Sequence, residues 1–238
     1  MTLHLAGAPV YIGATRDEVL FAATNAVLEV ARNAHRMPPS SRTSLSRSAH
    51  TIVVSGGATT PALARLIAES WPFTDIPTLI VSDERWSADP AMSNASQLAE
   101  YLAGSSFASS PVIAPVPDGD IAASAHEWSR LLDSCDEPFV SLLSMGDDGH
   151  VASLFPGCET EPVSKSVIVC RESPKPPPTR FSLSVEYLRR VPSRFAFAIG
   201  ADKAQALHRI AAGESLPAGE VHPTCWFIDE AAAGSLRR

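Results

Sequence analysis

Short apolar runs alternate along the chain with longer segments whose apolar residues recur at helical spacing. Each run ends in glycine or in polar residues, as strands do where they meet a loop. The expected strands lie at 51–57, 77–85, 138–146 and 194–200. The expected helices lie at 15–36, 61–70, 93–104, 121–134 and 201–213.

Two helix starts and one helix end have recognisable residues. Thr15 and Ser93 precede helical patterns and are suited to N-cap positions, and Gly104 is suited to end the helix that Ser93 begins. The segment 37–50 is rich in serine, proline and arginine, and we expect it to be an exposed linker.

The alternation of strands and helices predicts an α/β fold built from βαβ units. We expect a Rossmann-like, mostly parallel sheet with helices on both faces, in a single domain over residues 1–238. Ligands of such sheets bind beyond the carboxyl ends of the strands. Polar loops follow the expected strands, so they can converge on one pocket.

Composition narrows the class of protein. A net charge of -7 argues against nucleic acid as a partner, and no apolar stretch is long enough to span a membrane. The 4 cysteines form no CxxC motif, which favours a reducing cytoplasm and gives no sign of a zinc knuckle.

The glycine loop Ser55-Gly56-Gly57-Ala58-Thr59 joins a strand to a helix. Backbone N–H groups in such a loop can bind phosphate at the helix N-terminus, although the same residues also suit a tight turn. Thr60 is as good a hydroxyl donor as Thr59, and the sequence leaves open which of them contacts a phosphate.

Charged residues follow two further strands and precede another. Asp83, Glu84 and Arg85 can contact a phosphosugar or form a surface ion-pair cluster. Arg180 follows a stiff proline-rich segment and can bind an anion or be solvated. Lys203 is expected in the first turn of a helix, where the helix dipole disfavours a cation unless an anion compensates.

The segment SMGDDGHVASLFPG, residues 144–157, places His150 two positions after Asp148. Histidine is the side chain best suited to act as a base near neutral pH, and Asp148 can orient its ring. A turn histidine without catalytic role is the alternative. No HxH or HxxxH spacing exists, so we expect no metal site.

The same segment resembles the GxGxDGHxASLFPG signature of 6-phosphogluconolactonases, which form one larger family with glucosamine-6-phosphate isomerases and deaminases. Other stretches are also similar to family motifs, namely SGGATTP, SDERWSADPAMSN, SPKPPPTRFSLS, GADKAQAL and LPAGEVHPTCWFID. The chain departs from the signature at Ser144, at Asp147 and at Val151, and its glycine loop is one residue longer. None of these departures removes a residue expected to take part in chemistry.

One position separates the branches of this family. In the deaminases a glutamate follows the signature histidine after four intervening residues, whereas this chain has Phe155 there. Phenylalanine cannot transfer a proton, so the resemblance favours the lactonase branch.

The resemblance implies hydrolysis of 6-phospho-D-glucono-1,5-lactone to 6-phosphogluconate in the oxidative pentose phosphate pathway, without metal or cofactor, by a monomer or homodimer. It implies a catalytic base, His150, oriented by Asp148. It also implies a set of phosphate-binding residues, namely Ser55, Gly56, Gly57, Ala58, Thr59, Arg85, Arg180 and Lys203. Asp83, Glu84 and Asn94 are expected to contact the rest of the substrate. A related isomerase or deaminase and a non-catalytic sugar-phosphate sensor remain as alternatives.

Overall fold

The structure is a computed structural model that describes residues 3–36, 50–234 and 236. Its main sheet has eight strands in the order β1-β2-β12-β11-β7-β3-β4-β6. All neighbouring strands are parallel except β1 and β2. The strands are β1 (His4–Leu5), β2 (Ala8–Gly13), β3 (Thr51–Val54), β4 (Thr78–Val81), β6 (Val112–Ile113), β7 (Val140–Ser144), β11 (Ser193–Ala198) and β12 (Cys225–Asp229).

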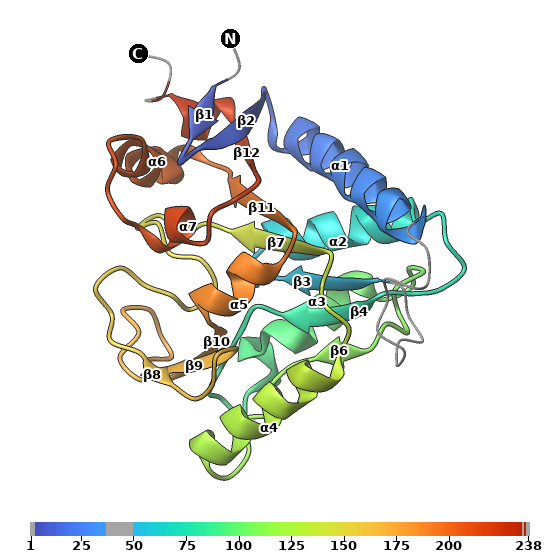
Figure 1. Ribbon diagram of the computed structural model, residues 1–238, viewed down its shortest axis with the longest axis vertical. Helices are drawn as coiled ribbons and strands as arrows, with labels where there is room; N and C mark the ends of the chain where they lie inside the picture. The colour runs from blue at the N-terminus through green and yellow to red at the C-terminus, as the bar shows by residue number, and fades with distance from the viewer. Residues whose placement is uncertain (1–2, 37–49, 235, 237–238) are drawn as a thin grey trace.

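Helices cover both faces of this sheet (Figure 1). Helix α2 packs against both α1 and α3, and α1 and α2 contact the strands beneath them. The α-helices are α1 (Arg16–Arg36), α2 (Thr59–Glu69), α3 (Asn94–Leu102), α4 (Ile121–Ser134), α5 (Val185–Arg190), α6 (Ala204–Ala211), α7 (Pro217–Glu220) and α8 (Glu230–Ala233), with 3-10 turns η2 (Pro90–Met92) and η3 (Ala201–Lys203). The predicted mostly parallel α/β sheet is therefore confirmed.

A second, antiparallel sheet was not predicted. It has the order β5-β10-β9-β8, formed by β5 (Asp83–Arg85), β10 (Arg180–Leu183), β9 (Val167–Cys170) and β8 (Glu161–Pro162). Residues 83–85 were expected to be the charged end of the strand at 77–85, but they form the separate strand β5, which pairs with β10. The partner strand β10 comes much later in the sequence, so no local pattern predicts this pairing.

Local helix signals agree with the structure. The Thr15 hydroxyl accepts a hydrogen bond from the Glu18 N–H, and the Ser93 hydroxyl accepts one from the Ser96 N–H. Helix α2 begins two residues earlier than expected, at Thr59. Among the described residues, no helix is both long and apolar enough to cross a membrane.

The expected linker at 37–50 needs a correction at its last residue. Residues 37–49 lie outside the described residues. His50, however, is fully buried and packs among Trp71, Phe73 and Phe139 at the start of β3. His50 lies between a serine-rich segment and the apolar run of β3, so only the tertiary packing shows that this histidine belongs to the core.

Candidate active site

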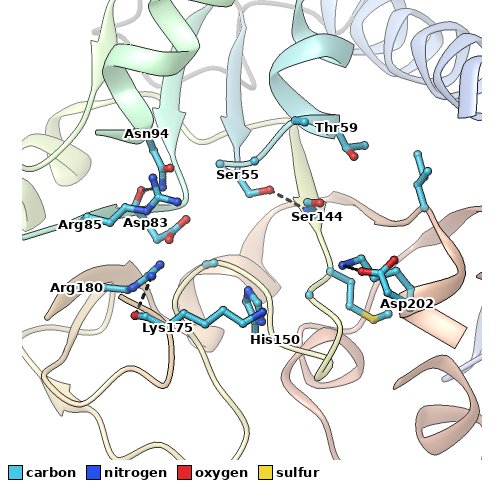
Figure 2. A pocket seen from close by; sticks show the side chains of 18 of the residues that line it. Ser55, Thr59, Asp83, Arg85, Asn94, Ser144, His150, Lys175, Arg180 and Asp202 are labelled. Carbon is cyan, nitrogen blue, oxygen red and sulfur yellow. Dashed lines mark hydrogen bonds and ion pairs between the residues drawn. The ribbon is translucent and has the colours of Figure 1, made fainter. Parts of the chain in front are cut away.

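A cavity of about 470 Å³ lies where loops from both sheets meet at the carboxyl edge of the parallel strands. Figure 2 shows Arg85 and Arg180 on one side of it, Asp202 on the other, and Ser55 and Thr59 between them. It is lined by Ser55, Gly56, Gly57, Ala58, Thr59, Asp83, Arg85, Asn94, Ser144, Met145, Gly146, His150, Ala152, Lys175, Pro176, Arg180, Ile199, Asp202 and Lys203. All the site residues expected from the sequence line this cavity except Asp148 and Glu84.

His150 and Asp148 form a hydrogen-bonded pair at the cavity wall. The Asp148 carboxylate lies 2.5 Å from Nδ1 of His150 and also accepts the His150 backbone N–H at 3.0 Å. A carboxylate only accepts, so Nδ1 carries the ring proton and the Nε2 lone pair is left for a proton from another molecule. Asp148 thus lies behind the histidine ring and not against the cavity.

The surroundings of this pair favour a neutral histidine and an ionised aspartate. Burial lowers the pKa of His150 below its usual value, against the opposing effect of the Asp148 carboxylate. Burial opposes ionisation of Asp148, but hydrogen bonds from His150 and the charge of Lys175 outweigh it and lower the Asp148 pKa. A neutral imidazole oriented by an ionised carboxylate is the state in which histidine can accept a proton.

The ring of His150 is held between a glycine and an aromatic side chain. A Cβ on Gly146 would lie 2.0 Å from two ring atoms of His150, so a larger residue at this position would displace the ring. The ring of Phe155 packs against His150 with centroids 4.5 Å apart. Phe155 therefore supports the ring through apolar contact and offers no proton.

Two arginines lie side by side on neighbouring strands of the antiparallel sheet. Arg180 in β10 pairs directly with Arg85 in β5, and both side chains line the cavity. The guanidinium of Arg180 donates to the backbone carbonyls of Lys175, Pro176 and Pro177, which fix its position. Like charges on directly paired positions are unfavourable, so this arrangement favours a bound anion.

Strand geometry separates the two acids of β5. Successive side chains of a strand point to opposite faces, so Asp83 and Arg85 face the cavity and Glu84 does not. The Glu84 carboxylate is buried and accepts the Ser93 hydroxyl and the backbone N–H groups of Asn94 and Ala95. The expected contact between Glu84 and substrate is thus corrected, because this carboxylate stabilises the N-terminus of α3.

Asp83 and Asn94 line the cavity as expected from the sequence. The Asp83 carboxylate accepts the hydroxyls of Ser82 and Ser153. The Asn94 amide donates to the backbone carbonyl of Asp83, while its Oδ1 is buried against Gly56 without a hydrogen bond. Both side chains are anchored by the protein and still border the cavity.

The glycine loop presents the N-terminus of α2 to the cavity. No side chain caps this helix end, so its first N–H groups are available to a ligand. The buried Thr60 hydroxyl donates to the Ser55 carbonyl, whereas Thr59 lines the cavity. The Ser55 hydroxyl accepts the Ser144 N–H, which ties the ends of β3 and β7 together. Of the two threonines, Thr59 is therefore the one that borders the cavity.

Lys203 has an anionic partner within the protein, which corrects the expectation that it needs a bound anion. Lys203 ends the 3-10 turn η3 immediately before α6, and its ammonium pairs with the Asp202 carboxylate at 2.8 Å. An anion of the protein itself therefore offsets the unfavourable helix dipole. Lys203 nevertheless lines the same cavity as Arg180 and the glycine loop, although the three are distant in sequence.

Sequence reasoning did not identify Lys175 as a site residue. Lys175 lines the cavity and pairs with Asp147 at 2.5 Å. It lies in the proline-rich segment, where a single lysine does not by itself indicate a binding site. Only its place in the motif SPKPPPTRFSLS could have pointed to it. With Lys175, four basic side chains outnumber the two acidic side chains of the lining, so the cavity is positive in a chain that is negative overall.

Two groups of side chains within the described ranges could hold a metal ion by proximity. Asp147, Asp148 and His150 form one, and His35, His50 and Asp75 form the other, at the opposite edge of the sheet. In the first group Asp147 pairs with Lys175 and Asp148 with His150. Both carboxylates therefore already have partners, which does not favour a metal there.

Fold and cavity together describe an α/β protein with a histidine–aspartate pair inside a positively charged cavity. A model of the family described as glucosamine-6-phosphate isomerases/6-phosphogluconolactonase matches residues 15–228. The chain belongs to this family.

Curated relatives and solved structures agree with this assignment. The chain is 35% identical over 144 residues to a 6-phosphogluconolactonase from Rattus norvegicus, covering 51% of this chain and 56% of the relative. It is 35% identical over 141 residues to the Homo sapiens 6-phosphogluconolactonase, covering 53% and 55%. The chain thus spans about half the length of the curated relatives it matches.

The fold of a solved 6-phosphogluconolactonase from Thermotoga maritima matches with a TM-score of 0.77 at 22% identity, covering 92% of this chain and 98% of that one. A monomeric glucosamine-6-phosphate deaminase matches with a TM-score of 0.72 at 17% identity, covering 95% and 99%. Both branches of the family share this fold, so the fold does not separate them.

Proposed function

We propose that this protein hydrolyses 6-phospho-D-glucono-1,5-lactone to 6-phosphogluconate, a step of the oxidative pentose phosphate pathway. The observation that carries the proposal is the His150–Asp148 pair with Nδ1 bonded to the carboxylate, in a cavity rich in basic side chains. The similarity to 6-phosphogluconolactonases from several organisms supports the same reaction.

The chemistry follows from these residues. Nε2 of His150 takes a proton from a water molecule as its oxygen attacks C1 of the lactone. Asp148 stabilises the resulting imidazolium, and the charge of Lys175 beside it stabilises the oxyanion. When the bond from C1 to the ring oxygen breaks, the imidazolium returns the proton to that oxygen. A lactone carbonyl is electrophilic enough to need neither a metal nor a covalent nucleophile.

The phosphate of the substrate is proposed to bind Arg180, Lys203 and the Ser55–Thr59 loop, with Arg85 assisting. A dianion offsets the repulsion between the paired arginines and accepts the free N–H groups of α2. Binding far from C1 helps to orient the reacting carbon toward His150. Asp83 and Asn94 are proposed to contact the sugar hydroxyls.

Packing of Phe155 on His150 favours the lactonase over the deaminase branch, because no carboxylate stands where amine chemistry would use one. We further propose a single domain that works in the cytoplasm as a monomer or homodimer, without a cofactor or bound metal.

The test is acid release on addition of freshly prepared phosphogluconolactone, with the spontaneous rate subtracted. We expect hydrolysis well above that rate, and no ammonia from glucosamine 6-phosphate. Ammonia release would identify a deaminase. Calorimetric binding of 6-phosphogluconate without any turnover of the lactone would identify a sensor.

A further inference from the structure

Two of the cysteines lie side by side behind the cavity. The Sγ atoms of Cys158 and Cys170 are 2.9 Å apart, and both thiols are free. This separation is close to the ~2.05 Å of a disulfide bond, so only a small approach of the two side chains would join them. The remaining cysteines, Cys135 and Cys225, are free and lie on other elements.

Cys158 can be reached from solvent and Cys170 cannot. Cys158 is half-buried and lines a second cavity of about 380 Å³, together with Glu159, Arg171 and Glu172. Cys170, at the end of β9, is fully buried. Burial, and then the hydrogen bond with Cys158, raise the pKa of Cys170 to about 12. A reagent in solution therefore meets Cys158 first.

The pair is connected to the candidate active site through direct contacts. Cys170 is the register partner of Arg180 in the antiparallel sheet. The guanidinium of Arg180 lies over the ring of Phe155 at 5.5 Å, and Phe155 packs on His150. Cys158 follows the segment that carries Phe155. Cys170 thus lies beside Arg180, which lines the cavity, and Cys158 lies close in sequence to Phe155, which packs on the His150 ring.

We propose that Cys158 and Cys170 are a redox site that forms a reversible disulfide with a small disulfide such as oxidised glutathione. The bond joins the segment after Phe155 to strand β9 beside Arg180. Disulfides of proteins in reducing compartments are usually transient and redox-sensing, which fits a free thiol pair of this kind.

The exchange balances in two steps. Cys158 loses its proton to solvent, and the thiolate attacks one sulfur of glutathione disulfide. The S–S bond of the glutathione disulfide breaks, and one glutathione leaves as a thiolate that takes up a proton. Cys170 then loses its proton and attacks the Cys158 sulfur of the mixed disulfide, which releases the second glutathione as a thiol. The protein gives up two electrons and two protons, and the reagent is reduced to two thiols.

The experiment treats the full chain with oxidised glutathione, then maps the cysteine peptides by mass and measures the melting temperature. We expect a Cys158–Cys170 cross-link with the loss of two hydrogen atoms, and a rise in Tm of ~3–10 °C that dithiothreitol reverses. The Cys135→Ser and Cys225→Ser variants should behave like the wild type. The Cys170→Ser variant should stop as a glutathione adduct on Cys158, and Cys158→Ser should give neither adduct nor cross-link at Cys170.

The proposal is overturned if the wild type stops at a glutathione adduct on Cys158, if both thiols stay free, or if the cross-link joins other cysteines. If Cys170→Ser fails to fold in the buried strand, Cys170→Ala tests the same step. None of these measurements uses the lactonase reaction, so their failure would leave the proposed function standing.

Discussion

The two sides of the cavity are built in different ways. On one side, loops at the carboxyl ends of β3, β7 and β11 present the glycine loop, the His150–Asp148 pair and Lys203. On the other side, the antiparallel pairing of β5 with β10 places Arg85 opposite Arg180. The first side depends on short loops after strands, while the second depends on the register between two distant segments.

This difference separates the roles that we propose for the two sides. The histidine and aspartate meet through a turn of a few residues, so their geometry is carried by local sequence. The arginines meet only if the second sheet forms, and the backbone carbonyls around Lys175 hold one of them. Changes on the first side should therefore reduce chemistry, and changes on the second side should reduce anion binding.

The largest effect is expected from His150→Ala. Loss of the base should lower kcat at least ~10²-fold, because general-base catalysis typically contributes that much or more. Binding of 6-phosphogluconate, measured by calorimetry, should change little. The exposed His126→Ala is the matched control. Near wild-type turnover by a folded His150→Ala protein would remove the proposed base.

Arg180→Ala tests the antiparallel side. Removal of a charged contact to phosphate should cost about 1.5–3 kcal/mol, or roughly 10- to 150-fold in affinity for 6-phosphogluconate. The weak binding of unphosphorylated gluconate should be spared. Arg130→Ala, which removes an exposed arginine of α4, serves as the control. Equal weakening of both ligands would show that Arg180 is not a phosphate contact.

Lys203→Ala tests the parallel side of the proposed phosphate site. We expect a smaller loss of affinity than for Arg180→Ala, near the ~10-fold end of the range, because Asp202 already shares the charge of Lys203. Competition assays with 6-phosphogluconate measure it, and exposed Lys165→Ala is the control. A loss that exceeds that of Arg180→Ala would reverse the proposed ranking of the two sides.

The pH profile tests the environment of the base. Burial lowers the pKa of His150 below its ordinary 6.5, Lys175 lowers it further, and Asp148 and Asp83 raise it. Protonation removes the base, so kcat/KM should fall only as pH drops below 6.5. Asp148→Asn removes a group that raises the pKa, so it should move this acid limb to still lower pH and also reduce kcat. An acid limb above 6.5 in the wild type would contradict the proposed environment.

Chelation is expected to have the smallest effect. Activity should survive exhaustive treatment with EDTA, because the carboxylates nearest His150 are already paired with Lys175 and with the ring itself. The assay is the same acid release, before and after dialysis. Activity lost with EDTA and restored by a divalent metal would reassign Asp147, Asp148 and His150 as ligands.

Much of the fold and part of the site could be predicted because their signals are local. Strand and helix periodicity repeats within a few residues, and the caps at Thr15 and Ser93 act on N–H groups three residues away. The Asp148–His150 contact likewise spans two residues, so a motif of adjacent letters could identify it.

The tertiary structure decided what depends on distant partners. Glu84 faces α3 because β5 pairs with β10, and strand alternation then directs Asp83 and Arg85 to the cavity. Other contacts also join segments that no sequence pattern links. They are the packing around the buried His50, the ion pair of Lys175 with Asp147, and the contact of Cys158 with Cys170. Periodicity and capping are properties of neighbouring residues, whereas register and side-chain contact exist only once the strands have found their partners.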